Sequence, residues 1–159
     1  MEWDEPPPSI APEMREGLEK DLRSTPVDAL MTTPIRCVDP SCKLSEVRAD
    51  LVLGARGALP VVGADGTAVG LISKTDILRS EREGGATTVD EAMSPFVIAV
   101  QVGEPLDHAI SRMSHDQVHH VVVLNASRRP VGVVSSLDIL HWLTGRLGLS
   151  FARRESTKP

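Results

Sequence analysis

The segment from Val69 to Leu78 returns 62 residues later as Val131 to Leu140. The same offset aligns residues 27–78 with 89–140 without a gap, and 13 of the 52 aligned pairs are identical. Repetition at a fixed spacing indicates one small structural unit used twice. A unit of this size buries too little surface to be stable alone, so we expect the two copies to pack together.

Composition restricts the kind of protein this chain can be. Apolar residues make up 41% of the chain and aromatic residues only 3%, so the core must be aliphatic. The net charge of −5 arises mostly in the first 26 residues, which contain seven acids and three bases. The chain has no stripe of basic residues, so we expect no direct nucleic-acid partner. The sequence contains no run of about 18 apolar residues, so we expect no membrane span. The N-terminus lacks the basic and apolar regions of a secretory signal, so we expect a cytoplasmic location.

Hydrophobic periodicity predicts the order β-α-β-β-α in each repeat. The strands are expected at 35–38, 58–62, 68–72, 96–102, 120–124 and 131–134, and the helices at 43–54, 104–115 and from Ser73 and Ser135 onward. The predicted fold is therefore α+β, with tandem repeats related by a pseudo-twofold axis. We divide the chain into a disordered acidic arm with a short helix at 13–23 (1–26), a first domain (27–82), a second domain (89–146) and a polar tail (147–159).

Cysteine and histidine do not combine into a recognisable metal site. Cys37 and Cys42 lie in the first repeat with no histidine close in sequence, so we expect free thiols. His115, His119 and His120 are close together but form no repeated i, i+4 pair with a carboxylate, and no metal is expected. Because His119 and His120 are neighbours in a predicted strand, their side chains should point to opposite faces.

Each repeat contains the motif Ser-x-x-Asp at a strand-to-helix junction, as Ser73 to Asp76 and Ser135 to Asp138. One interpretation is a capping box, in which the serine is the N-cap. A second is ligand binding, because a helix N-terminus presents unpaired N–H groups to a phosphate and a nearby acid can accept hydrogen bonds from ribose hydroxyls. The motif has no activated nucleophile and no matched acid–base pair, so it suits holding a ligand better than transforming one.

Taken together, these motifs resemble the CBS-domain family, named after cystathionine β-synthase. The landmarks are Met31–Ile35 and Met93–Phe96 at the start, Ala58–Val62 and His120–Val123 in the middle, and Gly-h-h-Ser-x-x-Asp-Ile-Leu at the end of each repeat. The resemblance covers residues 27–140 and implies two domains paired into a Bateman module. Such modules commonly bind AMP, ADP, ATP or S-adenosylmethionine at two related sites in the cleft between the domains.

Carried over to this chain, the resemblance implies two ligand sites, A and B. At site A, Ser135 would contact phosphate and Asp138 the ribose hydroxyls, with His119 and His120 at positions that are often basic. The adenine side of site A would come from the other repeat, through Thr33, Pro34, Ile35, Gly57 and Ala58. Site B exchanges the roles and would use Ser73, Asp76, Lys74, Arg79, Ser94, Pro95, Phe96, Val118 and His119.

The two predicted sites differ in charge. Gly57-Ala58 stands where the second repeat has His119-His120, so site B lacks that pair. Neutral histidines are weak phosphate partners near pH 7, because the unperturbed pKa is about 6.5. A triphosphate would need Arg128, Arg129 or His141 to point inward. We therefore expect site A to be the stronger site, with a mono- or diphosphate preferred over ATP.

The resemblance implies a regulatory sensor and not an enzyme. We expect an adenosyl ligand to shift the packing of the domains, with no required cofactor, and an unidentified partner protein to respond in trans. A homodimer is the expected assembly, since closed twofold symmetry is the common way to bury remaining apolar faces. Two alternatives stay open: a constitutive protein-interaction module whose Ser-x-x-Asp motifs act only as caps, and an enzyme with an unrecognised site.

Overall fold

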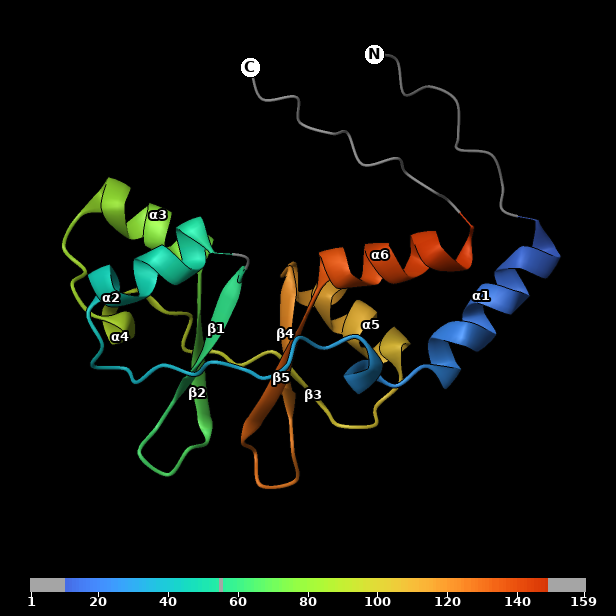
Figure 1. The fold of residues 1–159 in the computed structure, drawn as a ribbon, viewed down its shortest axis with the longest axis horizontal. Coiled ribbons are helices and arrows are strands. Elements are labelled where there is room, and N and C mark those ends of the chain that lie inside the picture. The colour runs from blue at the N-terminus through green and yellow to red at the C-terminus, as the bar shows by residue number, and fades with distance from the viewer. Residues whose placement is uncertain (1–10, 55, 149–159) are drawn as a thin grey trace, which may run out of the picture.

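The computed structural model describes residues 11–54 and 56–148, and it confirms the predicted α+β fold of two repeats (Figure 1). The first repeat contains η1 (Val27–Ala29), α2 (Leu44–Arg48), η2 (Ala49–Leu53), β1 (Ala58–Val62), β2 (Ala68–Ser73) and α3 (Lys74–Glu83). The second contains α4 (Val89–Ala92), β3 (Ala99–Gln101), α5 (Leu106–Asp116), β4 (His120–Leu124), β5 (Pro130–Ser135) and α6 (Ser136–Arg146). Figure 1 shows the hairpins of the two repeats next to each other, with the helices around them.

Helix α1 (Pro12–Ser24) precedes both repeats and confirms the helix predicted at 13–23. It lies against α5, and its Leu22 packs on the core of the second repeat. The arm before residue 11 and the tail after residue 148 lie outside the described residues. Within 11–54 and 56–148, no helix has the length and apolar character needed to cross a membrane.

Each repeat is built on an antiparallel hairpin. β1 pairs with β2 and β4 pairs with β5 in equivalent registers, with Ala58 opposite Ser73 and His120 opposite Ser135. Asp65 and Gly66 lie in the turn of the first hairpin, where Gly66 has a φ of 80° that favours glycine. β3 runs parallel to β4 and extends the second sheet to three strands. The hairpins place both serines of the repeated motif at the point where a strand ends and a helix begins.

Three predicted elements differ from the structure. The strand predicted at 96–102 is shorter, and only Ala99–Gln101 forms β3. No strand forms at 35–38, where only Val38 makes an isolated parallel bridge, to Val61. Thr32, three residues before Ile35, pairs with Val133 of the second repeat, so the chain crosses between the repeats in this segment. The helix predicted at 43–54 begins at Leu44 but changes to π geometry after Arg48.

The segment that opens each repeat packs against the other repeat. Val27 is fully buried in the core of the second repeat, and its N–H donates a hydrogen bond to the Glu104 carbonyl at 2.9 Å. Val89 is fully buried in the core of the first repeat, and its N–H donates to the Cys42 carbonyl at 2.9 Å. The two repeats are therefore interlocked by an exchange of these segments.

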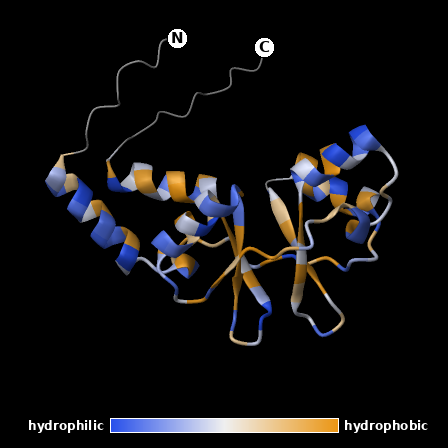
Figure 2. Ribbon diagram, turned by 180° about the vertical axis from the view of Figure 1, so that it is seen from behind, coloured by the Kyte–Doolittle hydropathy of each residue, from blue (hydrophilic) through white to orange (hydrophobic). Residues whose placement is uncertain are grey.

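The core is aliphatic, as the composition predicts, and it forms one cluster in each repeat. The buried members of the first cluster are Val38, Val47, Leu51, Leu59, Val61, Ile72, Ile77 and Val89. Those of the second are Val27, Val100, Leu106, Ala109, Met113, Val121, Val123 and Val134. Figure 2 shows hydrophobic residues concentrated along the central strands and hydrophilic residues over most of α1. Burial of this kind is the main favourable contribution to folding.

Candidate functional site in the cleft between the repeats

The Ser-x-x-Asp motifs both form complete capping boxes. The Ser135 hydroxyl donates a hydrogen bond to Asp138 Oδ2 at 2.6 Å, and the Ser135 and Asp138 backbone N–H groups complete the box at 2.8 and 3.1 Å. Ser73 and Asp76 repeat this geometry at 2.6, 2.9 and 3.3 Å. The structural interpretation of the motif is therefore confirmed, and any ligand must use what the capping box leaves free.

The two boxes leave different groups available. In both, the box occupies one carboxylate oxygen, Oδ2. Asp76 Oδ1 lies 3.7 Å from Arg79 Nη1, so its second oxygen is partly neutralised. Among the described residues, Asp138 Oδ1 has no hydrogen-bond or ion-pair partner. This oxygen is therefore the better acceptor for an incoming hydroxyl.

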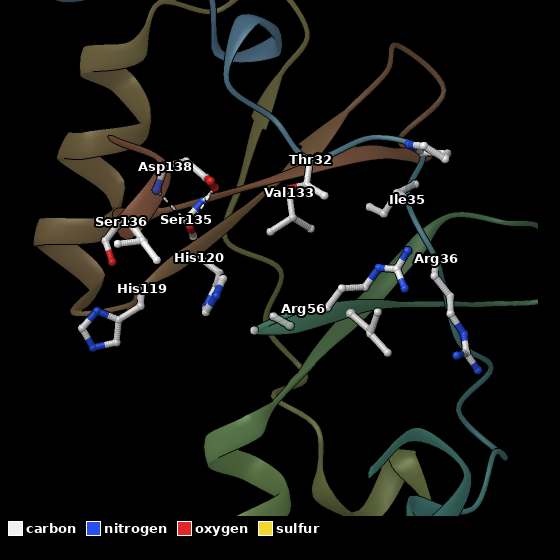
Figure 3. A pocket seen from close by; sticks show the side chains of 15 residues that line it. Thr32, Ile35, Arg36, Arg56, His119, His120, Val133, Ser135, Ser136 and Asp138 are labelled. Atoms are coloured by element: carbon white, nitrogen blue, oxygen red, sulfur yellow. Dashed lines mark hydrogen bonds between the residues drawn. The ribbon is translucent and has the colours of Figure 1, made fainter. Parts of the chain in front are cut away.

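Cavity A, of about 320 Å³, lies at the start of α6 (Figure 3). It brings together eight of the nine residues predicted for site A, namely Pro34, Ile35, Gly57, Ala58, His119, His120, Ser135 and Asp138. Thr33 does not line it, and its neighbour Thr32 does, because Thr32 is the residue that pairs with Val133 at the crossing. The cavity is thus built from both repeats, as the resemblance implies.

Cavity B, of about 430 Å³, lies at the start of α3. Of the residues predicted for site B, it brings together Ser73, Lys74, Asp76, Arg79, Ser94, Phe96, Val118 and His119. Pro95 does not line it, whereas Ser94 and Phe96 on either side of Pro95 do. Gly57, His119 and His120 line both cavities and form the wall between them.

Sequence reasoning missed two arginines of cavity A. Arg36 and Arg56 both line it, whereas Arg128, Arg129 and His141 do not. Arg36 is ion-paired with Asp50, and Arg129 donates to the Asp65 carbonyl in the neighbouring hairpin. Arg56 makes no ion pair or side-chain hydrogen bond within the described part of the chain, so its guanidinium is available to a ligand. Comparison of the repeats gives no signal for it, because Arg56 aligns with Val118.

The two adjacent histidines have different environments. His119 is exposed, while His120 is half-buried at the start of β4. Burial lowers the pKa of His120, the charge on His119 lowers it further, and the Asp138 carboxylate partly offsets both effects. Figure 3 shows His120 between His119 and Arg56, with the Ser135–Asp138 pair on one side of the cavity. Both side chains border both cavities, although the sequence predicted that they point to opposite faces of a strand. The prediction does not apply because β4 begins at His120 and His119 precedes it.

The arrangement can hold an elongated polar molecule. One end offers the free Asp138 Oδ1, a hydrogen-bond acceptor, and the other offers the Arg56 guanidinium, a hydrogen-bond donor. The rest of the lining is mostly apolar, from Ile35, Ala58 and Val133 among others. No group of three or more histidines, cysteines or acids is arranged to bind a metal within 11–54 and 56–148.

Comparison with known proteins identifies the repeats. The family model of the CBS domain matches residues 27–83 and 89–145. L-Aspartate semialdehyde sulfurtransferase of Methanocaldococcus jannaschii is 35% identical over 88 residues, which are 55% of this chain and 17% of that protein. The gamma-3 subunit of human 5'-AMP-activated protein kinase is 31% identical over 96 residues, 54% of this chain and 20% of that protein. The chain thus spans only a small part of these relatives.

Solved structures show the same fold. The CBS domain pair of protein MJ0100, in complex with 5'-methylthioadenosine and S-adenosyl-L-methionine, superposes with a TM-score of 0.72. It is 30% identical in sequence, and the match covers 77% of this chain and 98% of that one. CBSX2 in complex with AMP gives a TM-score of 0.66 at 20% identity, over 77% and 98% of the two chains, and supports the fold alone. The chain therefore belongs to the CBS-domain family and contains two repeats of that domain.

Proposed function

We propose that this chain is a regulatory module that binds an adenosyl ligand in cavity A. The observation that carries the proposal is the free Asp138 Oδ1, which lies in a cavity that Arg56 and His120 also line. Aspartate oxygens are common acceptors for the two vicinal hydroxyls of a ribose. The MJ0100 domain pair, which binds two such ligands at 30% identity, supports the same ligand class here.

The lining of cavity A assigns a part of the ligand to each side. The ribose hydroxyls donate hydrogen bonds to Asp138 Oδ1. The adenine lies on the apolar surface of Ile35 and Ala58 from the first repeat. A phosphate at the 5' position lies near Arg56 and His120, where a guanidinium makes charge-assisted hydrogen bonds. The proposed ligand is therefore AMP or ADP, because the Arg56 cation disfavours the positively charged sulfonium of S-adenosylmethionine.

Calorimetric titration with AMP and with adenosine tests this assignment of the phosphate. Hydrogen bonds to charged groups contribute about 1.5–3 kcal/mol, so AMP should bind at least about tenfold more tightly than adenosine. Arg56→Gln should remove most of that difference and leave adenosine binding unchanged. Arg128→Gln, which changes an exposed arginine outside the cavity, is the matched control and should change neither affinity.

Two results would contradict the assignment. Equal affinity for AMP and adenosine in the unmodified protein would remove the phosphate from the proposal. An equal loss of AMP and adenosine affinity in Arg56→Gln would mean that the arginine supports the cavity and does not contact phosphate. Chromatography of AMP after incubation with the protein should show no turnover, and a product would favour the enzyme alternative.

The proposed output is a change in assembly. Leu137 and Leu140 of α6 are 57% and 54% exposed. Leu78 of α3, which aligns with Leu140, is 46% exposed. Leu137 also lines cavity A, so an occupied cavity and this apolar surface share a residue. We propose that this surface forms a twofold homodimer whose packing the ligand alters.

Sedimentation should show a dimer that Leu140→Glu dissociates and that Met14→Glu, on α1, does not. A monomeric unmodified protein would overturn the dimer.

The second candidate function is a constitutive interaction module. It is favoured by one observation, the complete capping boxes, which account for the repeated serines and aspartates without a ligand. If this candidate holds, none of the adenosyl compounds should bind and the dimer should form without them.

A further inference from the structure

We infer that cavities A and B are energetically coupled, and that the His120 imidazole is the residue that couples them. The inference rests on the proposed function, because it concerns two adenosyl ligands bound to one chain. Its basis is a short path of direct contacts that joins the N-terminus of α6 to the N-terminus of α3 through the wall shared by the cavities.

The path begins at α6. The first residue of this helix, Ser136, donates a backbone hydrogen bond to the His119 carbonyl at 2.9 Å. The next residue along the chain is His120, whose backbone lies opposite Ser135 in the β4–β5 pairing. A ligand that displaces the start of α6 therefore acts on the backbone that carries His120.

The path continues from His120 into the first repeat. A methyl group built on Gly57 would lie 2.5 Å from His120 Nε2 and 3.0 Å from Cε1, so the imidazole already packs against the Gly57 backbone. The Gly57 carbonyl in turn accepts a hydrogen bond from Lys74 N–H at 3.2 Å, and Lys74 is the first residue of α3. Movement of the imidazole therefore changes the support of the helix that begins at cavity B.

The repeat makes this contact one-sided. Ala58 occupies the position equivalent to His120, and its side chain is a single methyl group. The wall contains two imidazoles that both cavities share, those of His119 and His120, and the first repeat has Gly57 and Ala58 at the equivalent positions. Of the two, the His120 imidazole is the one that lies against Gly57. A phosphate in either cavity that draws the imidazole toward itself withdraws it from the other cavity. Two phosphate-bearing ligands should consequently oppose each other, which is negative coupling.

Calorimetric titration with AMP tests the coupling. Asp138→Ala and Asp76→Ala each leave one cavity with its capping box intact, so they give the affinity of each site alone. In the unmodified protein, the dissociation constant of the second AMP should be at least about fivefold higher than these single-site affinities predict. A factor of this size lies within the usual range of coupling between sites. His120→Ala also changes the affinity of each site, so its references are the double variants His120→Ala/Asp138→Ala and His120→Ala/Asp76→Ala. In His120→Ala the second AMP should bind as these references predict, to within about twofold. His108→Ala, an exposed histidine outside both cavities, should keep the coupling.

A second readout separates coupling from general destabilisation. In Asp138→Ala at AMP concentrations below those that fill the weakened cavity A, AMP binds in cavity B, and it should still shift the imidazole resonances of His120 in a ¹H–¹⁵N spectrum. Two AMP molecules that bind independently, or a coupling that survives His120→Ala, would overturn the inference and leave the proposed function standing. One AMP per chain in both the unmodified protein and His120→Ala would also overturn it. If AMP binds nowhere, the inference and the proposed AMP ligand both fall.

Discussion

At the scale of the residue, two equivalent glycines permit the crossing of the chain between the repeats. A methyl group on Gly70 would lie 2.6 Å from Met93 Sδ and 2.7 Å from the Ser94 carbonyl oxygen. That carbonyl accepts the Leu71 N–H at 3.1 Å, so it is not free to move away. Gly132 is crowded in the same way by Met31. Glycine is required here for close approach and not for an unusual backbone conformation.

Substitution of Gly70 tests this close approach. Gly70→Ala should lower the free energy of unfolding by about 1–3 kcal/mol, the usual cost of overpacking a core. Gly145→Ala is the matched control, because nothing lies within 4 Å of a methyl group there and the position is in α6. Alanine should stabilise that helix by about 0.5–1 kcal/mol. Urea denaturation measures both, and a Gly70→Ala protein as stable as the control would contradict the account.

His120 should make the protein sensitive to acid. Its pKa is lowered in the folded protein, mainly by burial, so folding favours the neutral imidazole. In the unfolded chain this histidine has a pKa of about 6.5, so just below pH 6.5 the unfolded chain binds more protons than the folded protein. The stability that the group contributes is therefore lost as the pH falls from about 6.5 toward the lower pKa of the folded state. His120→Gln should lose less stability than the unmodified protein between pH 7 and pH 5. Exposed His115→Gln should follow the unmodified protein, and parallel curves for His120→Gln would refute the prediction.

At the scale of the element, the sequence predicted what local patterns determine. The strands at 58–62 and 120–124 match the structure because each is an apolar run with a turn after it. The helices that follow Ser73 and Ser135 begin where capping chemistry requires. The strand predicted at 35–38 was wrong because its β-branched residues satisfy the local pattern, whereas the segment connects Thr32, which pairs with Val133 of the second repeat, to Val38, which bridges to Val61 of the first. Exchange between repeats leaves no local signal, so periodicity cannot detect it.

The exchanged segments should make the two repeats unfold together. Val89 follows the linker to the second repeat, but its side chain belongs to the core of the first. Val89→Ala should lower the free energy of unfolding by about 2 kcal/mol, typical of removing buried methyl groups. Because the segments interlock, the fluorescence of Trp142 in the second repeat should report the same shifted transition as circular dichroism. The measurement uses a Trp3→Phe background, so that Trp142 is the only tryptophan.

Independent unfolding of the repeats would appear as two transitions. In that case Val89→Ala would shift the circular dichroism of one transition and leave the Trp142 signal in place. Val27→Ala is the reciprocal control, because Val27 opens the first repeat and is buried in the core of the second. Both variants should shift both signals if the exchange holds the molecule together.

At the scale of the whole molecule, the comparison of the two repeats predicted most of the cleft but not its arginines. Residues at equivalent positions, such as Ser73 and Ser135, were found because the repeat itself draws attention to them. Arg56 aligns with Val118, and Arg36 aligns with Ile98, so the repeat gives no signal for a basic residue at either position. Their placement in cavity A depends on how the repeats pack, which only the three-dimensional structure provides.

The cleft also contains a difference between its two cavities that the repeat conceals. Both capping boxes have nearly the same hydrogen-bond lengths, so replacing either aspartate should cost similar stability. The second oxygen of Asp76 faces Arg79, whereas that of Asp138 is free among the described residues. Substitution of the two aspartates therefore isolates ligand binding from helix capping.

A thermal-shift titration of the unmodified protein, Asp138→Ala and Asp76→Ala with AMP, ADP, ATP, 5'-methylthioadenosine and S-adenosylmethionine tests the central claim most directly. Saturable binding to the folded state raises the Tm by mass action. We predict that AMP or ADP raises the Tm of the unmodified protein, that Asp138→Ala weakens this binding about tenfold or more, and that Asp76→Ala weakens it less. The claim is contradicted if no compound raises the Tm, or if Asp76→Ala weakens binding as much as Asp138→Ala.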